Sequence, residues 1–143
     1  MFTTLKPQVR TARLEILRKE YMDQIAADVA LRGRPLRVAS YVLAQHGDQR
    51  RADLTLIAEH AAEMGWQVAS STFADAGQPL PLLERSGFTE ACRYAARGFA
   101  DGVLAIARPA ITTDNDTYAR LLERLYQRHV FLAYLPALPE PTP

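Results

Sequence analysis

Short, continuous apolar runs alternate with segments of helical spacing along most of this 143-residue chain. The runs occupy residues 36–44, 66–73, 101–107 and 130–135, and polar or turn-forming residues follow them. Such runs predict buried strands of a parallel sheet, because parallel neighbours need crossover connections that cover both faces. The alternation therefore predicts an α/β fold with a parallel-stranded sheet of about four strands flanked by helices.

The segments between these runs carry the signals of helices and loops. Gly65 is placed to end the helix predicted over residues 49–64, and Asp114 is a plausible N-cap for the helix predicted over residues 118–128. Residues 74–81 contain prolines that cannot join a strand ladder, so a loop is expected there. The predicted helices span residues 49–64, about 87–97 and 118–128.

Residues 1–34 predict an N-terminal helical arm before the α/β domain of residues 35–136 and a proline-rich tail at 137–143. An extra N-terminal amphipathic helix is expected over residues 8–31, because apolar residues recur at intervals of three to five. The apolar stripe consists of Val9, Leu14, Leu17, Tyr21, Ile25 and Val29. Either the body of the chain or the same helix of a second copy must cover it, and we expect a homo-oligomer through this helix.

Charge is unevenly distributed in a chain whose 17 basic and 16 acidic residues leave a formal charge of +1. The first 19 residues hold five basic residues and one acid, whereas residues 35–143 hold ten arginines and twelve acids. Weak attraction to DNA is therefore expected only near the N-terminus. The candidate nucleic-acid contacts are Arg10, Arg13, Arg18 and Lys19.

Several classes of protein find no support in the sequence. The single cysteine, Cys92, cannot form an internal disulfide, and no run approaches the roughly 20 apolar residues of a membrane helix. No glycine-rich phosphate loop and no cluster at metal-ligand spacing occurs, so we expect no cofactor and no metal. The start of the chain lacks the apolar stretch of a secretory signal, which favours a cytoplasmic protein.

Three segments carry a resemblance to a known family. Tyr41-Val42-Leu43-Ala44-Gln45 resembles a strand with the pattern Tyr-x-Arg-x-Ser, and residues 73–77 resemble a Phe-x-Asp-x-Gly loop. The Glu-Arg-Ser-Gly-Phe segment at 84–88 is similar to Asp-Arg-Pro-Gly-Leu, and residues 101–104 fit the strand that follows. Together they resemble the catalytic domain of the resolvase/invertase-type serine recombinases, and this resemblance spans residues 36–135.

The departures from the family pattern predict a loss of activity. The resemblance implies a serine that attacks a DNA phosphate and arginines that stabilise the charge developing on it. Gln45 stands at the nucleophile position, Leu43 stands at an arginine position, and Arg108 lies two residues early for another. Tyr41, Asp75 and Arg85 match the family but form a vestigial site without a catalytic residue. We therefore expect no enzyme activity in DNA strand exchange.

Three functions follow from these patterns. The leading hypothesis is a catalytically inactive serine-recombinase-like protein that acts as an interaction or regulatory module. One alternative is an accessory protein of recombination or mobile elements that binds DNA but does not cut it. Sequence-specific binding of DNA is not expected, because the sequence ends in prolines and lacks the family's DNA-binding domain. The other is a small-molecule binder or enzyme that reuses the old pocket, with Gln45, His46, Asp75 and Arg85.

Overall fold

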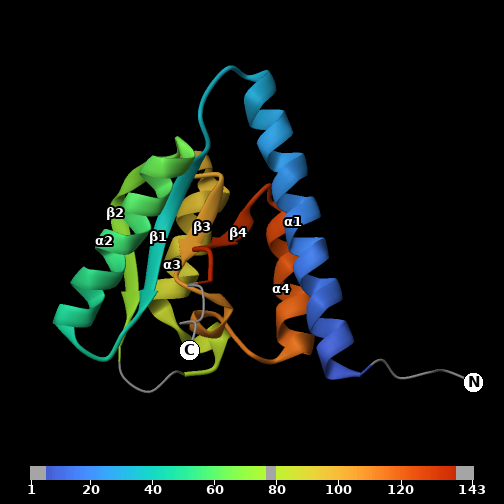
Figure 1. The fold of residues 1–143 in the computed structure, drawn as a ribbon, viewed down its shortest axis with the longest axis vertical. Coiled ribbons are helices and arrows are strands. Elements are labelled where there is room, and N and C mark those ends of the chain that lie inside the picture. The colour runs from blue at the N-terminus through green and yellow to red at the C-terminus, as the bar shows by residue number, and fades with distance from the viewer. Residues whose placement is uncertain (1–5, 77–79, 138–143) are drawn as a thin grey trace, which may run out of the picture.

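The computed structural model describes residues 6–76 and 80–137. Within them, helices and parallel strands alternate after one long N-terminal helix (Figure 1). The α-helices are α1 (Pro7–Leu31), α2 (Gly47–Met64), α3 (Ser86–Tyr94) and α4 (Asn115–Gln127). The strands are β1 (Arg37–Leu43), β2 (Gln67–Asp75), β3 (Gly102–Ala105) and β4 (Phe131–Tyr134).

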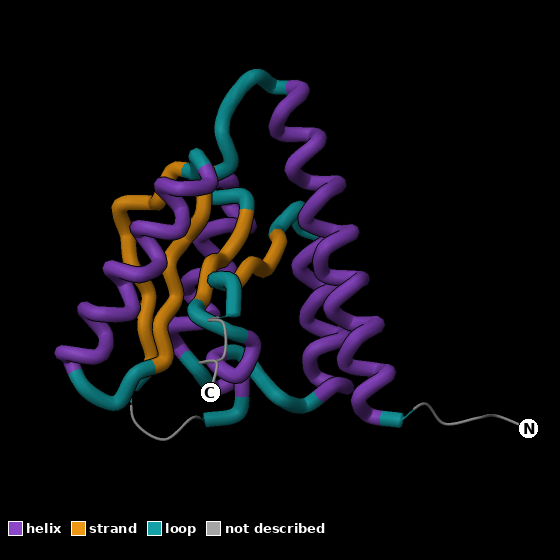
Figure 2. The backbone as a smooth tube through the Cα atoms, in the orientation of Figure 1, coloured by secondary structure: helices purple, strands orange, loops and turns teal. Residues whose placement is uncertain are grey.

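The four strands form one sheet in the order β2-β1-β3-β4, and every pair is parallel. The predicted parallel α/β sheet is thereby confirmed. Figure 2 shows the strands in the middle of the molecule, with helices on both sides. Since all strands point the same way, the loops after β1 and β2 meet at one end of the sheet.

Alternate residues of β1 enter two separate hydrophobic cores. Ala39 and Tyr41 belong to the core that α3 and α4 cover, whereas Val38 and Val42 belong to the core under α2. This separation follows from the two-residue period of a strand, which sends successive side chains to opposite faces. A continuous apolar run such as residues 36–44 is what a strand buried on both faces requires.

The N-terminal helix packs against the rest of the chain and contributes to both cores. It lies beside α4 and β4 at one edge of the sheet (Figure 1). Leu14 enters the core of α3 and α4, and Ile25 and Val29 enter the core of α2. The chain itself therefore covers the apolar stripe from Leu14 onward, while Val9 remains 42% exposed. The homo-oligomer expected through this helix stays a prediction.

The two edge strands of the sheet differ in their protection. β4 is shielded by α1, whose Arg18 donates from Nη1 to the Leu132 carbonyl oxygen at 2.7 Å. β2 is mostly exposed, and its register against β1 shifts between the pairs Val38–Val68 and Ser40–Thr72. A bulge of this kind interrupts an edge and discourages pairing with another chain.

Three of the differences between predicted and observed elements have an evident structural cause or feature. β2 extends through Ala74 and Asp75, which the prolines downstream had assigned to a loop, because Asp75 pairs in register with Leu43. The third helix changes after Tyr94 into a π-helical turn that contains Gly98 at φ 96°. α4 begins three residues earlier than predicted, because the Asp114 side chain accepts a hydrogen bond from the Thr117 N–H at 2.8 Å.

Some predictions fall outside the described residues, namely those on residues 1–5, part of the 74–81 loop and nearly all of the proline-rich tail. Within the described ranges, no helix combines the length and the apolar character needed to cross a membrane.

Candidate functional site

Asp75 lies at the carboxyl end of β2 and organises the start of α3. Its Oδ2 accepts hydrogen bonds from the Tyr41 hydroxyl at 2.7 Å and from the Phe88 N–H at 2.9 Å. Its Oδ1 accepts one from the Gly87 N–H at 2.8 Å. The carboxylate thus satisfies two backbone donors in the first turn of α3, where the helix dipole also favours negative charge. The geometry of Asp75 is that of a structural helix cap.

Gly87 is required by the close approach of α3 to β2. A Cβ atom at this position would lie 2.1 Å from the Ala74 carbonyl oxygen, a distance at which the backbone would have to shift. The absence of a side chain lets the first turn of α3 sit directly on the end of β2. This contact explains why a glycine stands between Ser86 and Phe88 in the segment that resembles the family motif.

Arg85 is buried, with 7% of its surface exposed, and it ties two loops together. Its Nε donates to the Leu80 carbonyl oxygen at 2.8 Å, and its Nη1 donates to the Ala110 carbonyl oxygen at 2.9 Å. Two of the three guanidinium nitrogens are therefore occupied by backbone acceptors. An arginine held in this way stabilises the loops after β2 and β3, and only part of it is left to meet an anion.

Tyr41 is fully buried beneath this cluster. Burial raises the pKa of the Tyr41 hydroxyl well above its usual value, and the hydrogen bond to the Asp75 carboxylate raises it further, while the Arg85 guanidinium acts in the opposite direction. The hydroxyl is therefore a neutral hydrogen-bond donor at any physiological pH. It holds Asp75 in place and is a poor nucleophile.

Two of the predicted site residues, Leu43 and Gln45, lie at the end of β1. Leu43 is half-buried and pairs with Asp75 in register, and Gln45 is exposed just beyond the strand. The predicted site residues therefore come together where β1 and β2 end, as the parallel topology requires. A carboxamide and an aliphatic side chain supply neither a nucleophile nor a positive charge to this end of the sheet.

Arg108 is held by contacts within its own loop and with α4. Its Nε donates to the Thr112 carbonyl oxygen at 3.1 Å, and its Nη2 donates to Asn115 Oδ1 at 2.8 Å. The guanidinium also lies 4.0 Å from the centre of the Tyr118 ring, within the range of a cation–π interaction. These contacts hold Arg108 against its own loop and α4.

Comparison with known proteins bears on the fold. No protein-family model and no curated protein sequence matches the chain. Among solved structures, the C-terminal catalytic domain of ISC1926 TnpA, an IS607-like serine recombinase, is similar with a TM-score of 0.60 and 16% identity over 72% of each chain. The N-terminal catalytic domain of TP901-1 integrase is similar with a TM-score of 0.60 and 21% identity, over 68% of this chain and 75% of that one.

The chain has the fold of a serine recombinase catalytic domain.

The basic residues that the sequence predicted to contact DNA fall into an exposed or partly exposed group and a buried one. Arg13 and Lys19 are exposed on α1, and Arg10 is partly exposed and paired with Asp116 at 2.6 Å. Arg18 is different: it is 7% exposed and bonded to Glu15 and to the Leu132 carbonyl oxygen. The prediction that Arg18 is free to contact nucleic acid is wrong, because the buried face of α1 includes it.

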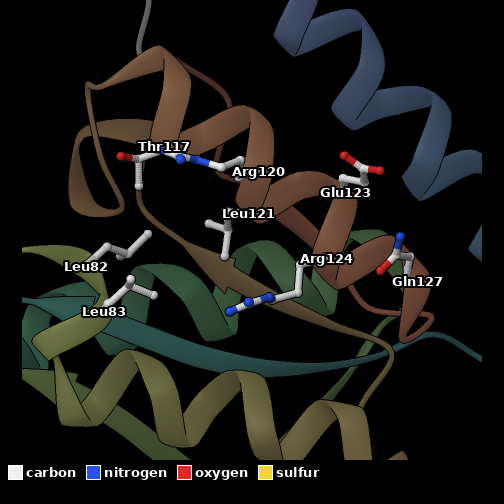
Figure 3. A pocket seen from close by; sticks show the side chains of 8 residues that line it. All are labelled: Leu82, Leu83, Thr117, Arg120, Leu121, Glu123, Arg124 and Gln127. Carbon is white, nitrogen blue, oxygen red and sulfur yellow. The ribbon is translucent and has the colours of Figure 1, made fainter.

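The structure also has a surface that the sequence analysis did not predict. It is a groove between α3 and α4, closed at one end by the 3-10 helix Leu82–Glu84, with leucines at its base and arginines along its side (Figure 3). The signal was the spacing of Arg120, Arg124 and Arg128, which places three cations on one face of a helix. The sequence analysis missed this local excess of positive charge because it considered only the net charge of residues 35–143, which is negative.

Proposed function

We propose that this chain is a serine-recombinase-like protein without strand-exchange activity that acts as an interaction or regulatory module. The observation that carries the proposal is the engagement of Asp75 and Arg85 in internal hydrogen bonds. Asp75 accepts three hydrogen bonds from Tyr41, Gly87 and Phe88, and Arg85 donates to two backbone carbonyls. The architecture of the chain accounts for both residues without requiring a role in a reaction.

The chemistry of phosphoryl transfer supports the same proposal. Attack on a phosphodiester needs a nucleophile and preorganised cations or other donors, and loss of one such donor alone typically slows an enzyme about 10²–10³-fold. Gln45 offers no hydroxyl at the end of β1, and Leu43 offers no charge beside it. The combined loss leaves no efficient route to a covalent protein–DNA intermediate.

A direct test is the search for that intermediate. The full chain is incubated with supercoiled plasmid and with nicked, end-labelled duplexes, then denatured and separated on a protein gel. We expect no labelled protein band. The double variant L43R/Q45S restores an arginine and a serine at the end of β1, and we expect it to remain inactive because Arg85 stays bonded to Leu80 and Ala110. A labelled band with the unmodified chain would overturn the proposal.

A DNA-binding accessory that does not cut is the second candidate. It is supported by Arg13 and Lys19, which are exposed on α1 and form no ion pair among the described residues. Binding through such residues depends steeply on salt, because condensed counterions are released. Anisotropy of a labelled duplex, measured over a salt series for the unmodified chain and for R13E/K19E, tests this candidate. Absence of binding in dilute buffer excludes it.

The small-molecule alternative has no comparable support. Neither of the two hollows along the α3–α4 groove is lined by Gln45, His46, Asp75 or Arg85. The hydrogen bonds of Asp75 and Arg85 are directed at protein atoms, which leaves these two residues few free groups for a ligand.

A further inference from the structure

The groove between α3 and α4 contains two adjoining hollows of about 510 and 310 Å³. They share Leu82, Leu83, Leu121 and Arg124, so they form one continuous depression along α4. Figure 3 shows Leu82 and Leu83 facing Leu121 across one end of it. A depression of this length and depth can accommodate a helix or an extended segment of another molecule.

The base of the groove is apolar. Leu83 is 80% exposed, although burial of a leucine side chain is favourable. Phe88 and Cys92 extend the apolar lining toward α3. Burial raises the pKa of the Cys92 thiol to about 12, so this thiol adds no charge to the lining at neutral pH. The base of the groove suits aliphatic side chains.

The side of the groove formed by α4 is basic. Arg120, Arg124 and Arg128 follow one another at intervals of four residues, are all exposed, and form no ion pair among the described residues. Like charges at this spacing destabilise a helix. Glu123 also lines the groove, so three arginines stand against one carboxylate along α4 and the balance of charge on this side is positive.

We propose that this groove binds an acidic amphipathic helix of a partner protein. The leucine base would receive the apolar face of that helix, and the arginine row would meet carboxylates on its flank. From Arg120 to Arg128 the row extends about 12 Å at 1.5 Å per residue, which matches acidic residues on three successive turns of the partner. The inference rests on the proposed function in one respect, because it names the partner class of the interaction module.

Three other occupants fit the groove less well. A second copy presenting the same face would bring two arginine rows together, and like charges repel. Nucleic acid would satisfy the arginines but would leave the leucine base without apolar contacts. A flat anionic membrane would meet the arginines but could not fill a depression. Only an occupant that is both acidic and apolar complements the whole surface.

The test uses fluorescence anisotropy with a labelled 18-residue peptide that carries leucines on one helical face and glutamates on three successive turns beside it. We expect the triple variant R120E/R124E/R128E to weaken binding at least tenfold. The matched control R13E/K19E/R50E reverses three exposed charges elsewhere, none in an ion pair among the described residues, and should change binding less than twofold. L83S should weaken binding about tenfold through the lost apolar contact.

Several outcomes would overturn the inference. One is equal binding of a peptide in which every glutamate is replaced by glutamine, and another is equal loss with both triple variants. Binding of an 18-nucleotide DNA or of phosphatidylserine vesicles that depends on Arg120, Arg124 and Arg128, with no binding of the peptide, would assign the surface to those ligands instead. The labelled-DNA assay is independent: a covalent adduct would refute inactivity and leave the peptide result standing.

Discussion

Replacing Arg18 by methionine tests whether α1 is fastened to the sheet by a buried cation. Arg18 donates to the Leu132 carbonyl oxygen at 2.7 Å and to both carboxylate oxygens of Glu15, and its guanidinium lies 5.0 Å from the centre of the Tyr134 ring. Methionine keeps much of the apolar stem but removes every one of these contacts. The Leu132 carbonyl, in a residue that is 1% exposed, would be left without this donor.

The expected loss of stability can be assembled from these contacts. An unsatisfied buried carbonyl costs about 1–3 kcal/mol, and a partly desolvated cation–π contact contributes about 0.5–2 kcal/mol. Glu15 is 41% exposed at its side chain, so water can replace much of what Arg18 supplies to it. We therefore expect R18M to lower the free energy of unfolding by about 2–4 kcal/mol.

Urea unfolding followed by circular dichroism measures this change. With slopes of about 1–3 kcal/mol per molar urea, the midpoint should fall by roughly 1–2 M. The control R13M removes an exposed arginine of the same helix and should shift the free energy by no more than about 0.5 kcal/mol. The hydrogen bond from Arg18 lowers the pKa of Glu15, so that pKa should also return toward its ordinary value in R18M. Unfolding of R18M within about 0.5 kcal/mol of the unmodified chain would refute the assigned role of Arg18.

Four further variants or conditions test other contacts. D75N can no longer accept all three hydrogen bonds of the carboxylate and should lower the melting temperature; an unchanged melting temperature would argue against a structural cap. G87A should destabilise the chain by about 1–3 kcal/mol in urea, because its Cβ would meet the Ala74 carbonyl oxygen. Burial raises the pKa of Asp101 but the hydrogen bonds of Arg34 and Arg37 lower it more, so the net pKa is below the ordinary 3.8. The Asp101 carboxylate therefore contributes fully to the free energy of unfolding above pH 3.8, and this contribution is lost as the pH falls through the lowered pKa. D101N should make the free energy of unfolding depend less on pH in the acid range, and an unchanged dependence would contradict this. Cys92 lines the groove, but burial raises its pKa to about 12, so it should react with a thiol reagent at pH 8 far more slowly than an ordinary cysteine, and labelling at the rate of a free thiol would contradict this.

The sheet was predictable because its signal is local. The apolar run of residues 36–44 contains β1, and Gly65 ends α2 in the left-handed conformation that its position predicts. Asp75 was misplaced because the loop signal came from prolines downstream, whereas the end of β2 is set by pairing with Leu43 on another strand. Such a pairing depends on residues distant in sequence, which local patterns do not reveal.

The sequence predicted which residues form the candidate site, but it did not predict the hydrogen bonds that they make. Tyr41, Asp75 and Arg85 come together because parallel strands end at a common edge. That Arg85 bonds to the carbonyls of Leu80 and Ala110 depends on loop conformation, and no sequence pattern specifies it.

Arg18 could have been placed on the buried face of α1 by periodicity. It follows Leu14 by four residues and precedes Ile25 by seven, which are the intervals of one helical stripe. The sequence analysis placed Arg18 among the exposed cations because of its charge, since arginines are rarely buried without partners. The partner is a strand carbonyl 114 residues away in sequence, which spacing within α1 cannot indicate.

The packing of α1 against β4 has a consequence for synthesis. The helix that shields β4 leaves the ribosome well before that strand does, so the Arg18 side chain has no Leu132 carbonyl to bond until the intervening residues are made. At about 5–20 residues per second, the intervening chain takes roughly 6–20 s to make. During that interval the apolar stripe of the nascent helix has no sheet edge to cover, which makes it a segment that a chaperone would hold. Docking of α1 is thus delayed until β4 has been made.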